Sequence, residues 1–174
     1  MKNLNLIYKN MEYEIRIKNE FDFNLQEEWE DLQNGAKINF FQTFKWQKYW
    51  SEKCGNNSVN IITMLYKKDE LISILPLNIK KIKFVKILSW SGFPFSDYNQ
   101  PIMRQNQNLN SKDFNFIISK LYSVYKFDNI HLINCVNSNY LIKNKFISNN
   151  ISKLIFFKDE TDNQIINNLS KKIN

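Results

Sequence analysis

The sequence is poor in glycine, with three glycines among 174 residues. They are Gly35, Gly55 and Gly92, each far from the others. Loops that cradle phosphates, such as G-x-G-x-x-G or the P-loop, need glycines at close spacing. The sequence therefore excludes both of these nucleotide-binding motifs.

Histidine and cysteine are also scarce. His131 is the only histidine, so any Ser-His-Asp triad would have to be built on it. The two cysteines, Cys54 and Cys135, rule out a zinc site with four cysteine ligands. His131 and Cys135 are four residues apart on an expected strand, which spreads them along it. We therefore expect no metal site at this pair. We expect His131 to lie in the core with its imidazole hydrogen-bonded.

Arginine occurs only at Arg16 and Arg104, so the net charge of +7 comes almost entirely from lysine. Bidentate recognition of phosphate and guanine favours arginine, and nucleic acid is not the expected partner. Abundant lysine, asparagine and isoleucine are typical of an AT-rich coding sequence, which accounts for the charge without any partner. An anionic polymer or a membrane surface stays open as the alternative.

Long apolar runs are absent too. Stretches such as 74–77 are too short to span a bilayer, and residues 1–10 lack the apolar core of a signal peptide. The two cysteines show no sign of pairing, which fits a reducing compartment. We expect a cytoplasmic protein without a membrane span.

What the sequence does contain is an alternation of strand-like and helical apolar patterns. Together they predict an α/β fold with a mixed, largely antiparallel sheet flanked by helices. The expected strands are 13–18, 59–66, 71–77, 82–90, 129–135 and 151–157, and the expected helices run from Asn24 to Gly35, from Thr43 to Gly55, from Ser111 through Tyr125, over 140–146 and from Thr161 or Asp162 onward.

The first two helices each show an apolar face. Asn24 and Glu27 resemble a capping box, and the buried face then holds the set Leu25, Trp29 and Leu32. The second helix is expected to enter the core with an aromatic face, made by Trp46, Tyr49 and Trp50.

The central strands carry two informative features. Pro76 lacks an N–H, so it is expected at a sheet edge, a bulge or a strand end. A basic stretch follows it, interleaved with Ile82, Phe84 and Val85. Its lysines are Lys80, Lys81, Lys83 and Lys86. The stretch is typical of a solvated hairpin edge that lysine protects from aggregation, or it forms a groove for an anionic acceptor.

The last helix carries Ile165, Leu169 and Ile173 on one face, and its pattern continues without a stop signal to Asn174. A frayed terminal helix is one interpretation. The other, which we prefer, is a domain over residues 1–160, with 161–174 as the start of a helix that leads into a second domain.

Two segments could carry chemistry. The first is the aromatic run 40–50, which also reads as a helix packing into the core. The second is the loop 89–101, which follows a strand and is rich in aromatic and hydrogen-bonding side chains. Loops at strand ends often line ligand sites, although a structural turn around Gly92 and Pro94 fits as well.

From Glu28 onward the sequence resembles the N-terminal half of BioF2-like or CelD-like acetyltransferases of the GNAT superfamily, which are related to the FemAB aminoacyltransferases. The order of several short motifs carries the resemblance. They are the Trp29 helix, Phe41-Gln42-Thr43 with Trp46, Leu75-Pro76-Leu77, Ser91-Gly92, Asp97-Tyr98 to Pro101, and the basic segment Leu169-Ser170-Lys171-Lys172. FemAB-type enzymes tend to carry a lysine where this chain has Trp50, which favours the acetyltransferase-like branch.

The resemblance implies a GNAT-like half-domain that holds the acceptor in an acyl-CoA-dependent N- or O-acyltransferase. The acceptor would be a polysaccharide or cell-envelope precursor. In this reading Asp97 orients the acceptor and Tyr98 donates a hydrogen bond, with Glu70 and His131 as outside candidates. The expected substrate-binding residues are Gln42, Trp46, Trp50 and Asn99.

Acetyl-CoA or another acyl-CoA is the implied cofactor, held mainly by the second half that the resemblance leads us to expect. A site for its pyrophosphate needs successive free N–H groups at a glycine-bearing loop that opens a helix. Gly92 is followed by Phe93 and Pro94, and proline has no N–H. Two other functions stay open: a non-catalytic module that binds an anionic polymer, and a FemAB-like aminoacyltransferase fed by charged tRNA.

Overall fold

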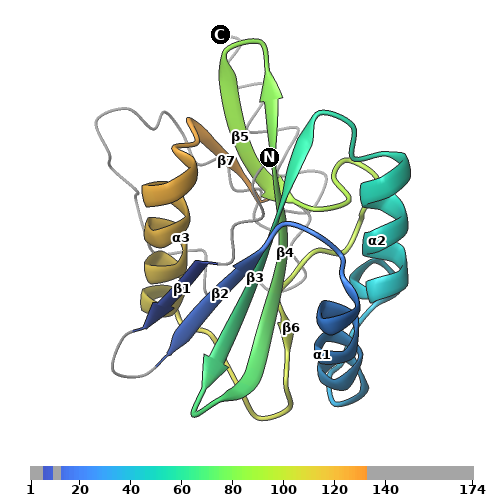
Figure 1. The fold of residues 1–174 in the computed structure, drawn as a ribbon, viewed down its shortest axis with the longest axis vertical. Coiled ribbons are helices and arrows are strands. Elements are labelled where there is room, and N and C mark those ends of the chain that lie inside the picture. The colour runs from blue at the N-terminus through green and yellow to red at the C-terminus, as the bar shows by residue number, and fades with distance from the viewer. Residues whose placement is uncertain (1–5, 10–12, 133–174) are drawn as a thin grey trace, which may run out of the picture.

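The computed structural model describes the backbone of residues 6–9 and all atoms of residues 13–132. Figure 1 shows a twisted sheet with helices on both faces. In chain order the elements are β1 (Leu6–Lys9), β2 (Glu14–Lys18), α1 (Phe23–Asn34), the 3-10 helix η1 (Phe40–Gln42), α2 (Phe44–Lys53), β3 (Ser58–Lys67), β4 (Glu70–Ile82), β5 (Val85–Trp90), β6 (Ile102–Met103), α3 (Ser111–Tyr125) and β7 (Asn129–His131).

The sheet is mixed and mostly antiparallel. Its strands follow the order β1-β2-β3-β4-β5-β7, and the short β6 pairs with β4 beside β5. Every pair is antiparallel except β5 with β7, which are parallel and joined by the crossover through α3. The expected α/β architecture, with a mixed and largely antiparallel sheet flanked by helices, is confirmed.

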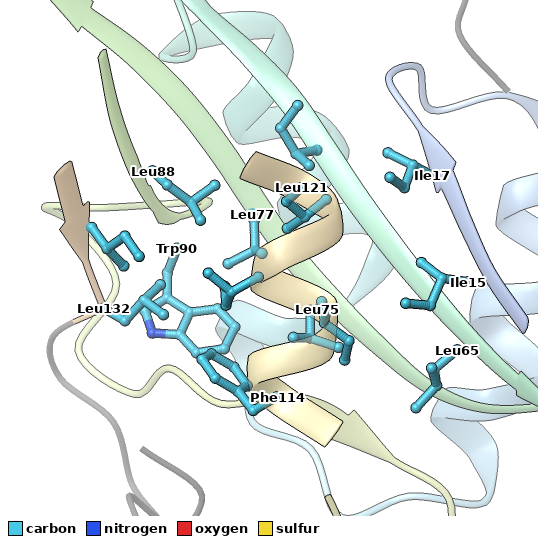
Figure 2. Packing of buried hydrophobic residues seen from close by; sticks show 14 of the residues in the cluster. Ile15, Ile17, Leu65, Leu75, Leu77, Leu88, Trp90, Phe114, Leu121 and Leu132 are labelled. Atoms are coloured by element: carbon cyan, nitrogen blue, oxygen red, sulfur yellow. The ribbon is translucent and has the colours of Figure 1, made fainter. Parts of the chain in front are cut away.

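Helices α1 and α2 cover one face of the sheet, and α3 covers the other (Figure 1). The larger core cluster lies under α3 and takes side chains from β2, β3, β4, β5 and β7. Figure 2 shows part of it around Phe114 and Leu121 of α3. The smaller cluster lies under α1, where Trp29 packs edge-on against Phe44 at a ring separation of 5.8 Å. Alternate residues of β3 and β4 supply the two clusters, as the period of a strand requires.

The predicted face of α1 is confirmed, because Leu25, Trp29 and Leu32 are all buried. Its start was predicted wrongly: the N-cap is Asp22, whose carboxylate accepts a hydrogen bond from the Leu25 N–H at 2.7 Å. A carboxylate at this position also lies favourably at the positive end of the helix dipole. Gly35 ends the helix as expected.

Helix α2 begins after Thr43, as predicted, and the Thr43 hydroxyl caps it. The predicted aromatic face is wrong in part. The buried residues are Phe44, Gln47 and Trp50, whereas Tyr49 is exposed. The helix is rotated because Phe44, at its first position, packs into the cluster under α1.

Strand β4 is longer than predicted and runs through Pro76, which is therefore neither at an edge strand nor at a strand end. Pro76 stands opposite Ile62 of β3, and on its other side its carbonyl accepts the Ser91 N–H. This is the point where the partner of β4 changes from β5 to β6. The missing N–H of proline thus faces a gap in the ladder, so no hydrogen bond is lost.

Helix α3 is confirmed, with its cap at Asn110 and not at Ser111. The Asn110 side chain accepts the N–H groups of Lys112 and Asp113. Of the predicted strand 129–135, the part Asn129–His131 is observed, and residues beyond 132 lie outside the described part of the chain. Expected elements beyond residue 132, including 140–146, 151–157 and the helix from 161, lie outside the described residues. Within the described part of the chain, no helix has the length and apolarity to cross a bilayer.

Candidate functional site

A cavity of about 460 Å³ opens on the face of the sheet that α1 and α2 cover. We call it the α2 cavity. Helix α2, the four strands β3, β4, β5 and β7, and the loop after β5 form its wall. The lining residues are Trp50, Cys54, Asn56, Ser58, Asn78, Lys80, Ile82, Ile87, Ser89, Phe93, Pro94, Phe95 and His131.

A row of polar residues crosses the sheet at this cavity. Asn78 of β4 pairs in register with Ser89 of β5, and Ser89 pairs with His131 of β7. Asn60 of β3 extends the row on the other side, opposite Asn78, and donates to the Ser51 hydroxyl of α2 at 2.7 Å. In-register neighbours on adjacent strands project from the same face of a sheet, so these side chains lie side by side.

The central pair of the row is buried and joined by a hydrogen bond. The Ser89 hydroxyl donates to the Asn78 side-chain oxygen at 2.6 Å. Since the serine proton is used in this bond, Ser89 offers only lone pairs to a third group. Asn78 keeps its amide N–H groups, which donate to none of the described residues.

His131 is half-buried, and its imidazole forms no hydrogen bond with any described residue. It is therefore not the satisfied core imidazole that its place on a strand suggested. Trp50 lines the same cavity, and its buried indole N–H is also without a partner in the described part of the chain. Unpaired polar groups beside a cavity are places where a ligand can bind.

The rim of the cavity differs from its floor. Lys80 and Ile82, both exposed, line it from the β4 end, and Phe95 lines it from the loop. The rim thus combines a cation with apolar surface, while the floor supplies neutral hydrogen-bonding groups and one imidazole. This is the composition of a small-molecule site, in which a few polar groups orient a largely apolar pocket.

The two predicted tryptophans lie in different surroundings. Trp50 lines the α2 cavity, whereas Trp46 packs against Phe40 and Phe41 with ring centroids 5.1 and 5.4 Å away. The Trp46 indole N–H is buried and has no partner among the residues described. It lies beside Gly92, whose positive φ of 98° is one that residues with a side chain rarely adopt, and a Cβ added there would lie 3.1 Å from the Cβ of Ser96.

The other two predicted binding residues are used within the fold. The Gln42 amide donates to the Gln100 carbonyl at 2.9 Å, and its oxygen accepts from Asn39. Asn99 is joined to Ser96 by two hydrogen bonds, of 2.7 and 3.1 Å. Both amides hold the 91–101 loop in its conformation and are buried.

Asp97 and Tyr98, predicted to be catalytic, stand on the outer side of that loop. Asp97 is exposed, and Tyr98 is 56% exposed with its ring 6.5 Å from that of Phe41. Neither residue lines the α2 cavity. Glu70, an outside candidate, pairs with Arg104 at 3.1 Å.

The two segments that could bind a pyrophosphate do not fit one. In the Gly92 loop the N–H groups of Phe93 and Phe95 already donate to Trp90 and Gly92. At the start of α3, Asn110 occupies the free N–H groups, and the Asp113 carboxylate adds negative charge. Neither segment therefore offers a set of free N–H groups to a pyrophosphate.

A second cavity, of about 570 Å³, lies at the opposite end of β4 between Lys37 and the 100–109 segment. Arg104 is its principal charge, and it is already paired with Asp31 at 2.6 Å and with Glu70. In the described part of the chain, no three metal-binding side chains come together at either cavity.

Sequence reasoning missed the polar row. The signal was a polar residue at an inward position in each of three apolar strands, at Asn78, Ser89 and His131. The strand register needed to align them was not readable from the sequence. Comparisons of the chain with protein-family models, with curated proteins and with solved structures find no match.

Proposed function

We propose that this chain forms the acceptor-side part of an acyl-CoA-dependent N- or O-acyltransferase and that the α2 cavity holds the acceptor. The observation that carries the proposal is the row Asn78, Ser89 and His131 on the cavity wall. Transfer of an acyl group to an amine or hydroxyl needs a base that takes the proton of the acceptor. The mixed sheet flanked by helices is also the architecture that a GNAT-like half-domain implies.

In this proposal His131 is the base. Its imidazole lines the cavity and is engaged by no other described residue, so a ring nitrogen can accept the proton that the amine or hydroxyl loses. Ser89 presents lone pairs that can hold the acceptor N–H or O–H toward the ring. The Asn78 amide fixes the serine hydroxyl through their hydrogen bond, which makes Asn78 a positioning residue.

The lining suggests the class of acceptor. Trp50, Phe93 and Phe95 offer apolar faces against which a sugar ring can pack, and Lys80 offers a cation for a phosphate or carboxylate. An amino sugar that carries a phosphate combines these features. Such a compound belongs to the polysaccharide and cell-envelope precursors that the resemblance implies.

The proposed reaction takes place in the cytoplasm. Cys54 is an exposed free thiol at the edge of the cavity, and such a thiol persists in a reducing compartment. The donor acyl-CoA is bound by residues other than the Gly92 loop and the start of α3, because the N–H groups of both segments are occupied.

The single histidine makes the binding step directly testable. The protein labelled on histidine gives one set of imidazole NMR signals, all from His131. We expect an amino sugar phosphate to shift these signals in a saturable way, and Ser89→Ala to weaken the binding. If the compounds bind without moving the His131 signals, the proposed site is wrong.

The chemical step is tested in the full-length protein, with the second domain that the resemblance implies, by the mass of the product after incubation with acetyl-CoA and the acceptor. His131→Asn should lower acyl transfer by about 10²–10⁴-fold, the usual contribution of a general base, while Glu27→Gln on the exposed side of α1 serves as the surface control. The sequence-based alternative makes a different prediction: if Asp97 and Tyr98 carry the reaction, Asp97→Ala and Tyr98→Phe lose turnover and His131→Asn keeps it.

A further inference from the structure

The tip of the β4–β5 hairpin exposes large apolar side chains. Phe84 is 93% exposed and Ile82 is 50% exposed, and Ile82 forms the last ladder pair with Val85. Figure 1 shows this hairpin, in green, reaching beyond the other strands and helices at one end of the molecule. Large apolar side chains that are exposed on a projecting turn are typical of a surface that binds a partner.

The same tip is strongly basic. Lys80, Lys81 and Lys83 are exposed, and none of them is paired with a carboxylate of the described residues. The segment 80–87 contains no acidic residue. The carboxylate that contacts it is that of Asp128, which accepts the backbone N–H of Lys86 at 2.7 Å.

We propose that this tip docks on an anionic lipid surface, with Phe84 and Ile82 in the interfacial region and the lysines at the headgroup phosphates. Lysine on an edge strand also protects against aggregation, but that role does not explain an exposed phenylalanine in the turn. A soluble polyanion would use the lysines and leave Phe84 without a role. A membrane uses both, because interfacial binding combines apolar burial with attraction to anionic lipid.

Docking would also bring the α2 cavity to the lipid. Lys80 and Ile82 line the rim of that cavity and lie on the hairpin, and Phe95, 66% exposed, lines the rim from the loop. An acceptor anchored in the membrane would then reach the row of Asn78, Ser89 and His131. This consequence rests on the proposed function, whereas the docking itself does not.

The test is co-sedimentation of the chain with vesicles. We expect binding to vesicles of phosphatidylcholine and phosphatidylglycerol in equal parts, and none to phosphatidylcholine alone. The combined variant K80Q/K81Q/K83Q should lower the partition coefficient by roughly 100-fold, since each lysine near an anionic surface contributes about fivefold. Phe84→Ser should lower it by about tenfold.

Two control variants test whether the loss of binding is specific to the hairpin tip or follows from removing any exposed phenylalanine or any three lysines. Phe23→Ser removes an equally large side chain that is 70% exposed on α1, and K37Q/K45Q/K53Q removes three exposed lysines elsewhere. Both should bind vesicles much more strongly than the tip variants. All four sets change surface residues, and a thermal unfolding curve shows that each variant is folded.

Three results would overturn the proposal. The first is no binding to the mixed vesicles by the folded chain. The second is an equal effect of Phe84→Ser and Phe23→Ser. The third is lysine-dependent binding to heparin without binding to vesicles, which assigns the tip to a soluble polyanion. None of these outcomes affects the His131 signals, so failure of docking and failure of the acceptor site are distinguishable.

Discussion

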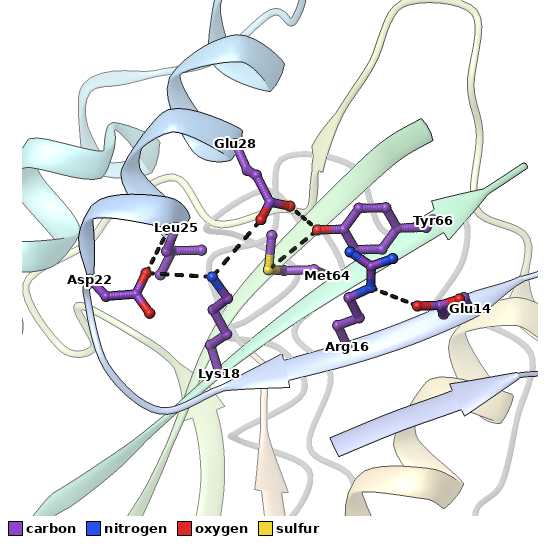
Figure 3. Close-up of polar contacts among 8 residues, drawn as sticks. All are labelled: Glu14, Arg16, Lys18, Asp22, Leu25, Glu28, Met64 and Tyr66. Atoms are coloured by element: carbon purple, nitrogen blue, oxygen red, sulfur yellow. Dashed lines mark hydrogen bonds and ion pairs between the residues drawn. The ribbon is translucent and has the colours of Figure 1, made fainter. Parts of the chain in front are cut away.

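Two polar clusters lie on the same face of the sheet and differ in how completely their groups are paired. Near α1, Lys18 lies between Asp22 and Glu28 at 3.4 and 3.9 Å, and the Tyr66 hydroxyl donates a hydrogen bond to the Glu28 carboxylate (Figure 3). Arg16 stacks on the Tyr66 ring at 3.9 Å. In the α2 cavity the imidazole of His131 and the indole N–H of Trp50 bond to no described residue.

The difference separates a structural cluster from a candidate site. A polar group that leaves water without a partner costs about 1–3 kcal/mol, so a network that serves only the fold tends to pair all its members. The cluster near α1 follows this rule and links β2, β3 and α1. In the α2 cavity, the His131 imidazole and the Trp50 indole N–H remain available for hydrogen bonds to a ligand.

The largest expected effect comes from a matched pair of tryptophans. The Trp29 indole donates to the Gln42 carbonyl at 3.1 Å, whereas the Trp50 indole has no partner among the described residues. Trp29→Phe should lower the free energy of unfolding by about 3 kcal/mol, from lost packing and an orphaned carbonyl. Trp50→Phe should cost clearly less. Urea denaturation measures both, and equal losses would contradict the distinction.

Removal of Glu28 tests whether the cluster near α1 is structural. Glu28→Ala leaves the buried Tyr66 hydroxyl with the weak Met64 sulfur acceptor at 3.9 Å, and it removes one of the two partners of Lys18. We expect a loss of about 2 kcal/mol in urea denaturation. Glu27→Ala, one residue away and exposed, is the control and should change stability little. A Glu28 variant as stable as this control would show that the cluster does not hold α1.

Ser89→Ala probes the buried centre of the polar row. The substitution leaves the Asn78 side-chain oxygen without its donor, so we expect a loss of about 1 kcal/mol. Ser123→Ala, on the exposed side of α3, is the reference for the loss of a serine hydroxyl. If Ser89→Ala is more destabilising than Glu28→Ala, the row is part of the structural framework and the contrast between the two clusters fails.

His131→Asn should have the smallest effect on stability. The imidazole is half-buried and forms no hydrogen bond with described residues, so we expect a change within about 0.5 kcal/mol. The same variant is expected to lose acyl transfer. Stability is measured by urea denaturation beside the activity assay, and a large loss of stability would show that His131 serves the fold.

Local sequence signals predicted the elements well where neighbours along the chain decide the structure. The apolar face of α1 and the cap of α2 at Thr43 both depend on residues a few positions apart. Errors arose where a distant contact decided the outcome. Phe44 rotates α2 by packing against Trp29, and Pro76 is tolerated inside β4 because its missing N–H faces the point where the partner of β4 changes from β5 to β6.

The candidate site shows the same limit more strongly. The family resemblance implied substrate-binding roles for Gln42 and Asn99, but both amides are used to hold the 91–101 loop. The α2 cavity depends instead on Asn78, Ser89 and His131, which are far apart in the sequence. Of the predicted binding residues, Trp50 lines this cavity.

The sequence by itself determined the class of fold and the helix caps to within two residues, and it excluded glycine-rich phosphate loops. Each of these depends on composition or on residues close together in the chain. Tertiary structure alone decided which polar residues meet. Ser89 and His131 are aligned by the parallel pairing of β5 and β7, which the crossover through α3 sets. A shift of one residue in that register would turn His131 to the opposite face of the sheet, and no local pattern contains that information.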